Sequence, residues 1–205
     1  MNGKWKRWEL ALMLGVLCAL GIGAWREGAQ EELADSVIRL HVIANSDSEA
    51  DQALKLAVRD RVLEQAECLY PEGADREEAR RALECHLNAL AAAGQAVVGE
   101  WGYDYPVSAE LTRCWFPTKE YDGFALPAGE YEALRVVIGE GEGQNWWCVA
   151  FPPLCLGAAS ETVEEAAQAG SFTREQAGLI TGETGGYVLK FKGMELLGEL
   201  KGVLS

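Results

Sequence analysis

The sequence contains only two histidines, His41 and His86, and it has no pair of cysteines in the Cys-x-x-Cys spacing. Zinc ribbons and thioredoxin-type redox sites depend on that spacing, and zinc enzymes usually take several histidine ligands. The composition therefore argues against a metalloenzyme and against a dithiol oxidoreductase, and we expect neither a metal nor another cofactor.

Basic side chains are also scarce, except at the start of the chain. The first 26 residues have a charge balance of +3, from Lys4, Lys6, Arg7 and Arg26 against Glu9 alone. The remainder has 14 basic and 31 acidic side chains, a balance of −17. A body this acidic repels phosphate backbones and anionic headgroups, so we expect no nucleic-acid partner.

An apolar run follows the basic start directly. Residues 10–24 are uncharged over 15 positions, which is the pattern of a secretory signal. As a helix this run is about 22 Å long, shorter than a hydrocarbon core of about 30 Å, although Trp8 and Trp25 at its ends would suit a tilted anchor. We expect residues 1–26 to be a signal peptide or a membrane anchor, and the protein to act outside the cytoplasm, secreted or membrane-anchored.

Six cysteines are present, and Cys18 lies inside the apolar run. The other five are an odd number for an exported body, so at least one thiol should be free or paired between molecules. They are Cys68, Cys85, Cys114, Cys148 and Cys155. Cys148 and Cys155 could form a disulfide, because Pro152 and Pro153 between them can fold the chain back. The alternative, that these two cysteines are not bonded to each other, stays open.

Patterns in the first half of the body indicate a strand and two long helices. Residues 37–44 are rich in β-branched side chains and predict a strand. The Ser-x-x-Glu spacing at residues 46–49 is that of a capping box and predicts a helix to about Cys68. The Asp-x-x-Glu spacing at residues 75–78 predicts a second helix that runs into the nineties, with His86 on its apolar stripe as a core or boundary histidine.

In the second half, apolar and polar residues alternate at 107–112, 134–138 and 187–191, which is typical of half-buried strands. We also expect a strand in the β-like run at 146–151, which ends at two prolines, and a short helix at 194–204. One strand, two helices and then several turn-linked strands predict an α+β domain: a mainly antiparallel sheet with two long N-terminal helices packed on one face. An apolar export or anchor helix precedes it.

These patterns divide the chain into four parts. Residues 1–26 are the export segment, 27–36 a polar linker, 37–156 the α+β domain, and 157–205 a C-terminal extension that starts with a loop or loose helix. No internal repeat is present.

Two motifs imitate catalytic or binding sites. The Gly-Glu-Gly-Glu-Gly loop at residues 139–143 resembles a phosphate-binding loop, but a strand follows it where such loops need a helix N-terminus, so we expect a flexible hairpin connection. His41 and Cys148 would suit a secreted thiol hydrolase. However, Arg39 shares the strand face of His41 and would lower its basicity, and Cys148 lies in an apolar run typical of buried cysteines. The thiol hydrolase is therefore the alternative to a protein without enzymatic activity.

Trp146 and Trp147 are neighbours on a predicted strand, so their side chains should point to opposite faces. One ring can then enter the core while the other faces solvent as an anchor for a partner. The alternative is that a helix and a loop bury both rings.

Six segments of the sequence form an unusual combination. They are VIRLHVIANSDS at residues 37–48, DQ at 51–52, KLAVRD at 55–60, FPT at 116–118, LPAGEY at 126–131 and VIGEGEGQNWWCVAFPPLC at 137–155. Together they closely resemble the signature of the stage II sporulation protein R family. The match covers roughly residues 37–156 and leaves the extension after it without support.

The resemblance implies an intercellular signal of endospore formation. Proteins of that family are exported from the forespore into the space between forespore and mother cell. There they activate a membrane-embedded aspartic protease that cleaves the precursor of a mother-cell sigma factor. The implied partners are that protease and, through an uncleaved N-terminal segment, the membrane, with no small-molecule substrate.

For such a signal we expect the contact surface at a strand edge and the loops beside it. The residues expected there are Arg39, His41, Asn45, Asn145, Trp146 and Trp147. A membrane-tethered adhesion or scaffold domain would share the same export segment and acidic body, and it stays open at this point.

Overall fold

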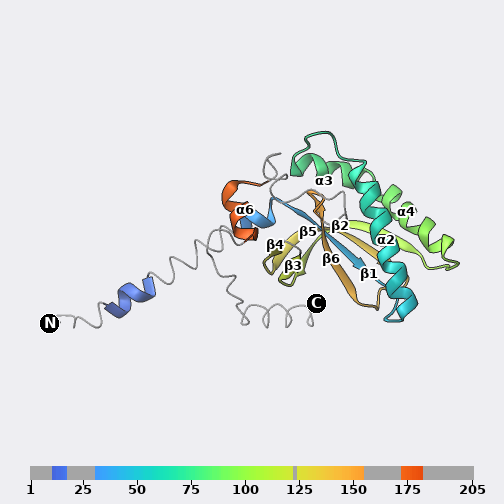
Figure 1. Cartoon of the computed structure of the whole chain (residues 1–205), viewed down its shortest axis with the longest axis horizontal. Helices are drawn as coiled ribbons and strands as arrows, with labels where there is room; N and C mark the ends of the chain where they lie inside the picture. Colours follow the sequence, from blue (N-terminus) through green and yellow to red (C-terminus); the bar gives the residue numbers. More distant parts are fainter. Residues whose placement is uncertain (1–10, 18–30, 122–123, 155–171, 182–205) are drawn as a thin grey trace.

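The computed structural model describes residues 11–17, 31–121, 124–154 and 172–181, most of which form an α+β domain (Figure 1). In chain order its elements are β1 (Ile38–Ile43), α2 (Glu49–Glu67), α3 (Arg76–Cys85), α4 (Leu87–Glu100), β2 (Val107–Phe116), β3 (Lys119–Tyr121), β4 (Phe124–Leu126), β5 (Gly129–Ile138), β6 (Asn145–Phe151) and α6 (Arg174–Thr181). The fold class predicted from the sequence is therefore confirmed in outline.

The main sheet has the strand order β2-β5-β1-β6. β2 pairs with β5 and β6 pairs with β1 in antiparallel fashion, whereas β1 and β5 are parallel. The sheet is thus mainly antiparallel, as predicted. β1 lies inside it with all six residues buried, and a strand covered on both faces needs a nearly continuous apolar run. Only Arg39 and His41 interrupt that run.

Helices α2, α3 and α4 cover one face of the sheet (Figure 1). Gly94 lets α4 approach closely, because a Cβ there would lie 3.0 Å from Val107 Cγ1 and 3.2 Å from Val58 Cγ1. The core beneath these helices is aliphatic and includes Leu40, Val42, Leu54, Leu90, Leu134 and Val136. Burying each of these side chains contributes about 1.5–3 kcal/mol to stability.

The start of α2 differs from the prediction. Ser48 is its N-cap, and the Ser48 Oγ accepts a hydrogen bond from the Asp51 amide at 3.1 Å. The capping box expected from Ser46 and Glu49 is therefore wrong. Ser46 is drawn away from a capping role because its Oγ donates to Asp51 Oδ2 at 2.5 Å.

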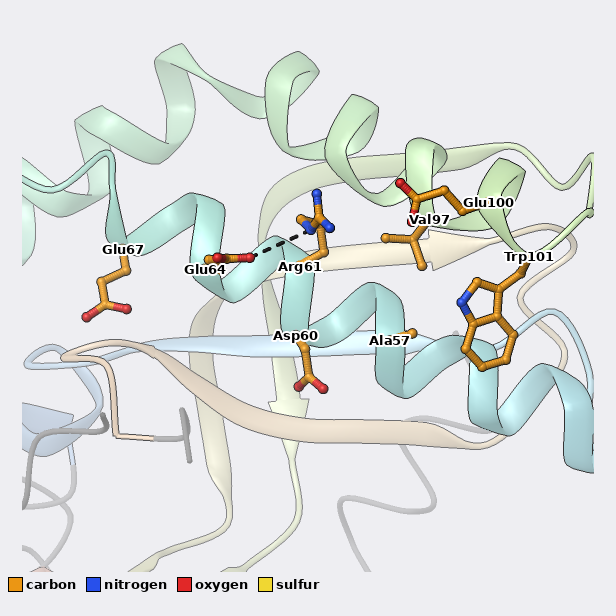
Figure 2. A pocket seen from close by; sticks show the side chains of 8 residues that line it. All are labelled: Ala57, Asp60, Arg61, Glu64, Glu67, Val97, Glu100 and Trp101. Carbon is orange, nitrogen blue, oxygen red and sulfur yellow. Dashed lines mark ion pairs between the residues drawn. The ribbon is translucent and has the colours of Figure 1, made fainter. Parts of the chain in front are cut away.

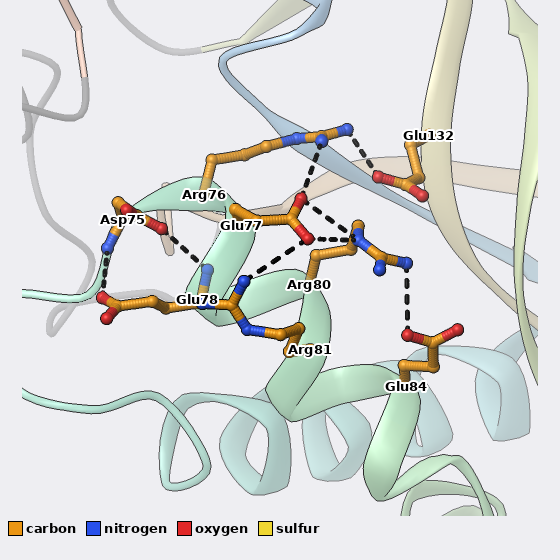
Figure 3. Close-up of polar contacts among 8 residues, drawn as sticks. All are labelled: Asp75, Arg76, Glu77, Glu78, Arg80, Arg81, Glu84 and Glu132. Atoms are coloured by element: carbon orange, nitrogen blue, oxygen red, sulfur yellow. Dashed lines mark hydrogen bonds and ion pairs between the residues drawn. The ribbon is translucent and has the colours of Figure 1, made fainter.

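The single long second helix expected after Asp75 is also wrong, since it is divided into α3 and α4. The capping box of Asp75 and Glu78 does open α3 (Figure 3). The break lies at His86, whose backbone has φ −120° and ψ 17° and whose amide bonds Leu83 O, three residues back. This tighter turn rotates the His86 ring out of the apolar stripe. The ring is exposed, so it is not the core or boundary histidine that we expected.

A second core cluster covers the opposite face of the sheet. It joins the main sheet to the β3–β4 hairpin and α6, through residues that include Phe116, Phe124, Leu126, Tyr131, Leu154, Phe172 and Ile180. Within the predicted linker, residues 31–34 form a helical turn, and Leu33 and Ala34 are buried in this cluster. Both faces of the sheet are therefore covered, which explains the burial of β1.

Residues 11–17 form a helix whose large apolar side chains are 45–64% exposed. Nowhere in the part of the chain that the structure describes is a helix both long and apolar enough to cross a bilayer. The rest of the predicted export segment lies outside the described residues. So do the strand predicted at 187–191 and the helix predicted at 194–204, and these three remain predictions.

Candidate partner-binding site

The six residues predicted to contact a partner belong to β1, the loop after it, and β6. Cross-strand pairing sets His41 opposite Trp147, and Ile43 opposite Asn145, at one end of the sheet. Arg39 and His41 are buried and Asn145 is exposed, whereas the remaining three are half-buried. The expectation that Arg39 and His41 lie at a strand edge is wrong, because β5 and β6 flank β1 on its two sides.

His41 supports the ring of Trp147. Their ring centroids are 4.0 Å apart with the planes at 17°, and Phe116 meets Trp147 edge-on at 4.7 Å. His41 Nε2 lies 3.0 Å from Asn145 Oδ1, so it donates to that amide oxygen in the neutral tautomer that the contact requires. We call His41, Asn145 and Trp147 the β6 edge triad.

Burial controls the charge of His41. It lowers the pKa of His41 to about 4, with a smaller lowering from the charge of Arg135 and an opposing effect of the Asn145 hydrogen bond. The ring is therefore neutral near pH 7, and its buried Nδ1 has no hydrogen-bond partner among the described residues. A neutral ring of such low pKa is a packing surface for Trp147 and a poor general base.

Arg39 is an internal support with no exposed surface. Its guanidinium lies 4.3 Å from the Phe116 ring centroid and 4.9 Å from that of Tyr131. Arg39 Nε donates to Cys148 O at 2.9 Å, and Nη2 donates to Tyr121 Oη at 2.8 Å. Burial lowers the pKa of Arg39, but the aromatic faces favour its charge. Arg39 thus ties β1 to β6 and the β3–β4 hairpin, and a partner cannot reach it.

Asn45 secures the glycine loop. The Asn45 Oδ1 accepts from the Glu140 amide at 3.1 Å, and its Nδ2 donates to Asp51 Oδ2 at 3.0 Å. Gly139 has φ +59°, and a Cβ there would come within 2.1 Å of Asn45 Oδ1. The loop between β5 and β6 therefore needs glycine at this position for a close approach of backbone to side chain.

The same contacts correct our expectation of a flexible hairpin. β5 and β6 are not neighbours, so the loop crosses over the end of β1. It is bound there by Gly143 N to Ala44 O at 3.0 Å and by Gln144 N to Asp47 Oδ1 at 2.7 Å. These amides of the loop bind acceptors within the fold.

Two charged residues of this region were not among the predicted site residues. Asp51 and Lys55 are each only 4% exposed. Hydrogen bonds from Ser46 and Asn45 lower the pKa of Asp51, while Lys55 Nζ donates to Gln52 Oε1 at 2.5 Å and to Gln144 O at 2.9 Å. The sequence feature that could have identified them is a pair of charged residues one turn apart on the apolar side of a predicted helix.

Trp146 points to the opposite face from Trp147, as the alternation of the strand predicted. It packs at the margin of the helical core, with the guanidinium of Arg59 4.4 Å from its ring centroid. Its indole nitrogen is buried, and no described residue forms a hydrogen bond with it. Neither earlier reading holds fully, because both tryptophans are half-buried.

The thiol hydrolase is excluded by geometry. Cys148 pairs with Leu40 and shares its face of the sheet, whereas His41 faces the other side with Trp147. Cys148 is also disulfide-bonded, so it offers no thiolate. Its predicted partner Cys155 lies outside the described residues, and that pairing remains a prediction. The free thiols among the described residues are Cys68, Cys85 and Cys114.

The described residues contain no group of histidine, cysteine and carboxylate side chains that could hold a metal ion. What the site offers instead is a rigid aromatic surface at the end of the sheet. Trp147 is held by two buried rings, and Asn145 beside it presents its side chain to solvent. Such an arrangement suits contact with the surface of another protein.

Comparison with known proteins adds two findings. The family model described as Stage II sporulation protein R matches residues 34–161. A protein named Stage II sporulation protein R from Bacillus subtilis (strain 168) is 41% identical over 124 residues, which cover 60% of this chain and 55% of that protein. The chain thus spans about half the length of the curated relative it matches. No solved structure matches.

Proposed function

This chain belongs to the stage II sporulation protein R family, which implies a role in sporulation, and from that premise we propose that it is an exported protein signal. It leaves the forespore, enters the space between forespore and mother cell, and binds a membrane-embedded aspartic protease. Binding activates the protease, which then cleaves the precursor of a mother-cell sigma factor. The chain itself performs no catalysis.

The observation that carries this proposal is the β6 edge triad. Trp147 is the kind of side chain that dominates protein interfaces, and its ring is held in place before any partner arrives. Because His41 and Phe116 already restrict the ring, binding loses little side-chain entropy. Asn145 is exposed on the same edge and adds a polar group that can form a hydrogen bond with a correctly aligned partner.

Activation by binding has a thermodynamic requirement. The chain must bind the active form of the protease more tightly than the inactive form, and a tenfold preference corresponds to about 1.4 kcal/mol. A rigid surface suits this task, since it cannot adapt equally well to two partner conformations. The pairing of Trp147 with a buried neutral His41 therefore supports a selective contact.

The proposed location rests on the N-terminal segment. The basic residues before an uncharged run at residues 10–24 favour export, and the exposed apolar side chains of residues 11–17 are consistent with contact to a membrane or an export machinery. The body that follows has a strong negative charge, which suits a domain that stays off anionic lipid.

Reconstitution in vegetative cells tests the proposal. The full chain, the protease and a tagged sigma precursor would be produced together in a non-sporulating culture, and precursor cleavage followed by immunoblot. Cleavage should appear only when all three are present. Cleavage at the same rate without this chain, or no cleavage with all three produced and correctly located, would refute the proposed activation.

A further inference from the structure

A groove of about 490 Å³ lies between α2 and α4, on the helical side of the sheet (Figure 2). Its lining consists of Ala57, Asp60, Arg61, Glu64 and Glu67 from α2 and Val97, Glu100 and Trp101 from the end of α4. This is the opposite side of the sheet from the β6 edge triad, so a ligand here would not compete for Trp147.

The apolar part of the groove has an unusual member. Trp101 is 48% exposed, and in the described part of the α+β domain only Leu56 is another large hydrophobic residue with such exposure. The backbone of Trp101 has a fixed position at the helix end. It is the C-cap of α4, with its amide bonded to Val97 O at 3.1 Å, and Gly102 with φ +81° turns the chain away directly after it.

The polar part of the groove has an excess of negative charge. The lining contains four carboxylates and one cation, Arg61, so its net charge is −3. Asp60 is engaged by Arg59 at 2.6 Å, and Glu64 is 3.7 Å from Arg61. The other two, Glu67 and Glu100, form no salt bridge with any described residue.

These carboxylates also stand where helices disfavour them. Glu64 and Glu67 lie in the last turn of α2 and Glu100 ends α4, and neither last turn contains a basic residue. A helix C-terminus carries partial negative charge, so acidic side chains there reduce stability and add to the local negative potential. Acidic residues at the C-termini of both helices that form one groove are a departure from ordinary helix preferences, and such departures are typical of functional surfaces.

α3 shows that the chain can neutralise its helix carboxylates. There Glu77 lies 3.1 Å from Arg80 and 3.6 Å from Arg81, while Glu84 is 3.2 Å from Arg80 (Figure 3). The groove differs from α3, because its Glu67 and Glu100 have no salt bridge among the described residues and are free to meet a positive charge from another molecule.

We propose that the α2–α4 groove binds a cationic segment of a partner protein, one in which lysine or arginine side chains flank an apolar side chain. The apolar side chain packs on Trp101, and the basic ones reach Glu64, Glu67 and Glu100. Lysine and arginine stems suit such a groove because their methylene groups cover Ala57 and Val97 while their charged ends meet the rim. The attraction holds whatever role the chain plays in sporulation.

A binding titration tests the groove. The full chain, held in a non-ionic detergent, would be titrated into a fluorescent peptide in which lysines flank a leucine and a tryptophan, with a glutamate-substituted peptide for comparison. The native chain should bind only the lysine peptide, more weakly as salt rises. Trp101→Ala should weaken binding about tenfold or more, and Trp101→Phe should restore most of it.

A charge-matched pair separates the groove from the overall acidity. Glu64→Gln combined with Glu100→Gln should lower the affinity and flatten its salt dependence. Glu72→Gln combined with Glu130→Gln removes the same charge from exposed sites outside the groove and should change the affinity by less than about twofold. Equal losses in the two double variants, no effect of Trp101→Ala, or no binding by the native chain would overturn the inference. Circular dichroism would verify that each variant is folded.

Discussion

The imidazole of His41 and the indole of Trp147 are stacked 4.0 Å apart across β1 and β6, with their planes inclined by 17°. The contact joins a buried residue of the central strand to a half-exposed residue of the strand beside it. A histidine that is a poor general base therefore still sets the position of the Trp147 ring, which we propose as a partner contact.

Replacing Trp147 should separate activation from folding. Trp147→Ala removes the supported ring and should reduce cleavage of the sigma precursor about tenfold or more, because an interface anchor of this type typically accounts for at least that factor. The measurement is precursor cleavage in the reconstituted system. Trp115→Ala is the matched control, as Trp115 is half-buried on β2 at the other edge of the sheet. Equal losses in both variants would point to a general defect and remove Trp147 from the proposed surface.

His41 should make stability depend on pH. Its pKa is about 4 in the folded chain against 6.5 when unfolded, so the unfolded state binds more protons between these values. Stability should be constant above about pH 6.5 and fall by about 2–3 kcal/mol as the pH decreases to 4. Urea unfolding across this range measures the effect. His41→Gln should remove most of it, whereas His86→Gln should retain it because His86 is exposed.

The glycine loop offers a test of close packing. Gly139→Ala should cost about 3 kcal/mol or more, because the new Cβ must displace the Asn45 side chain as well as adopt φ +59°. Gly73→Ala is the control. Gly73 has φ +68°, but no atom of the described residues lies within 4 Å of the added Cβ, so only the conformational cost of about 1 kcal/mol applies. Similar losses at the two positions would contradict the contact with Asn45.

Asp51 should matter for stability despite lying outside every predicted site. Asp51→Asn weakens the bonds from Ser46 and Asn45 and should cost about 2 kcal/mol in urea unfolding, since buried polar groups left without partners are destabilising. Because the folded pKa of Asp51 is lowered, its carboxylate contributes stability that is lost as the pH falls below its usual value of 3.8. Asp60→Asn, on the exposed side of the same helix, should cost less than about 0.5 kcal/mol.

Arg39 should not tolerate lysine. Arg39→Lys keeps a positive charge but loses the planar contact with Phe116 and Tyr131 and the paired donation to Cys148 O and Tyr121 Oη. A loss of about 2 kcal/mol is expected, seen as a lower midpoint of thermal unfolding. Arg113→Lys, at an exposed position on β2, should leave the midpoint nearly unchanged. An unchanged midpoint for Arg39→Lys would mean that the planar shape and paired donors of the guanidinium do not stabilise the fold.

Features that depend on residues close together in the chain could be predicted from the sequence. Alternation predicted β2 and the second half of β5, and an apolar run predicted β6. The opposite directions of Trp146 and Trp147 follow from strand geometry alone. The capping box of Asp75 and Glu78 is a contact across three residues, so it could be read from spacing. Family membership could likewise be inferred from the sequence, because contiguous segments of residues carry the resemblance.

Only the tertiary structure decided which strands are neighbours, and from that the site follows. Arg39 was expected at an edge, yet the parallel pairing of β1 with β5, whose residues are about ninety positions apart, puts it in the core. The separation of His41 from Cys148, the exposure of His86 and the meeting of Glu67 with Trp101 in one groove arise in the same way. Each depends on packing between distant segments, whose energy is a property of the assembled chain and is not encoded in any local pattern.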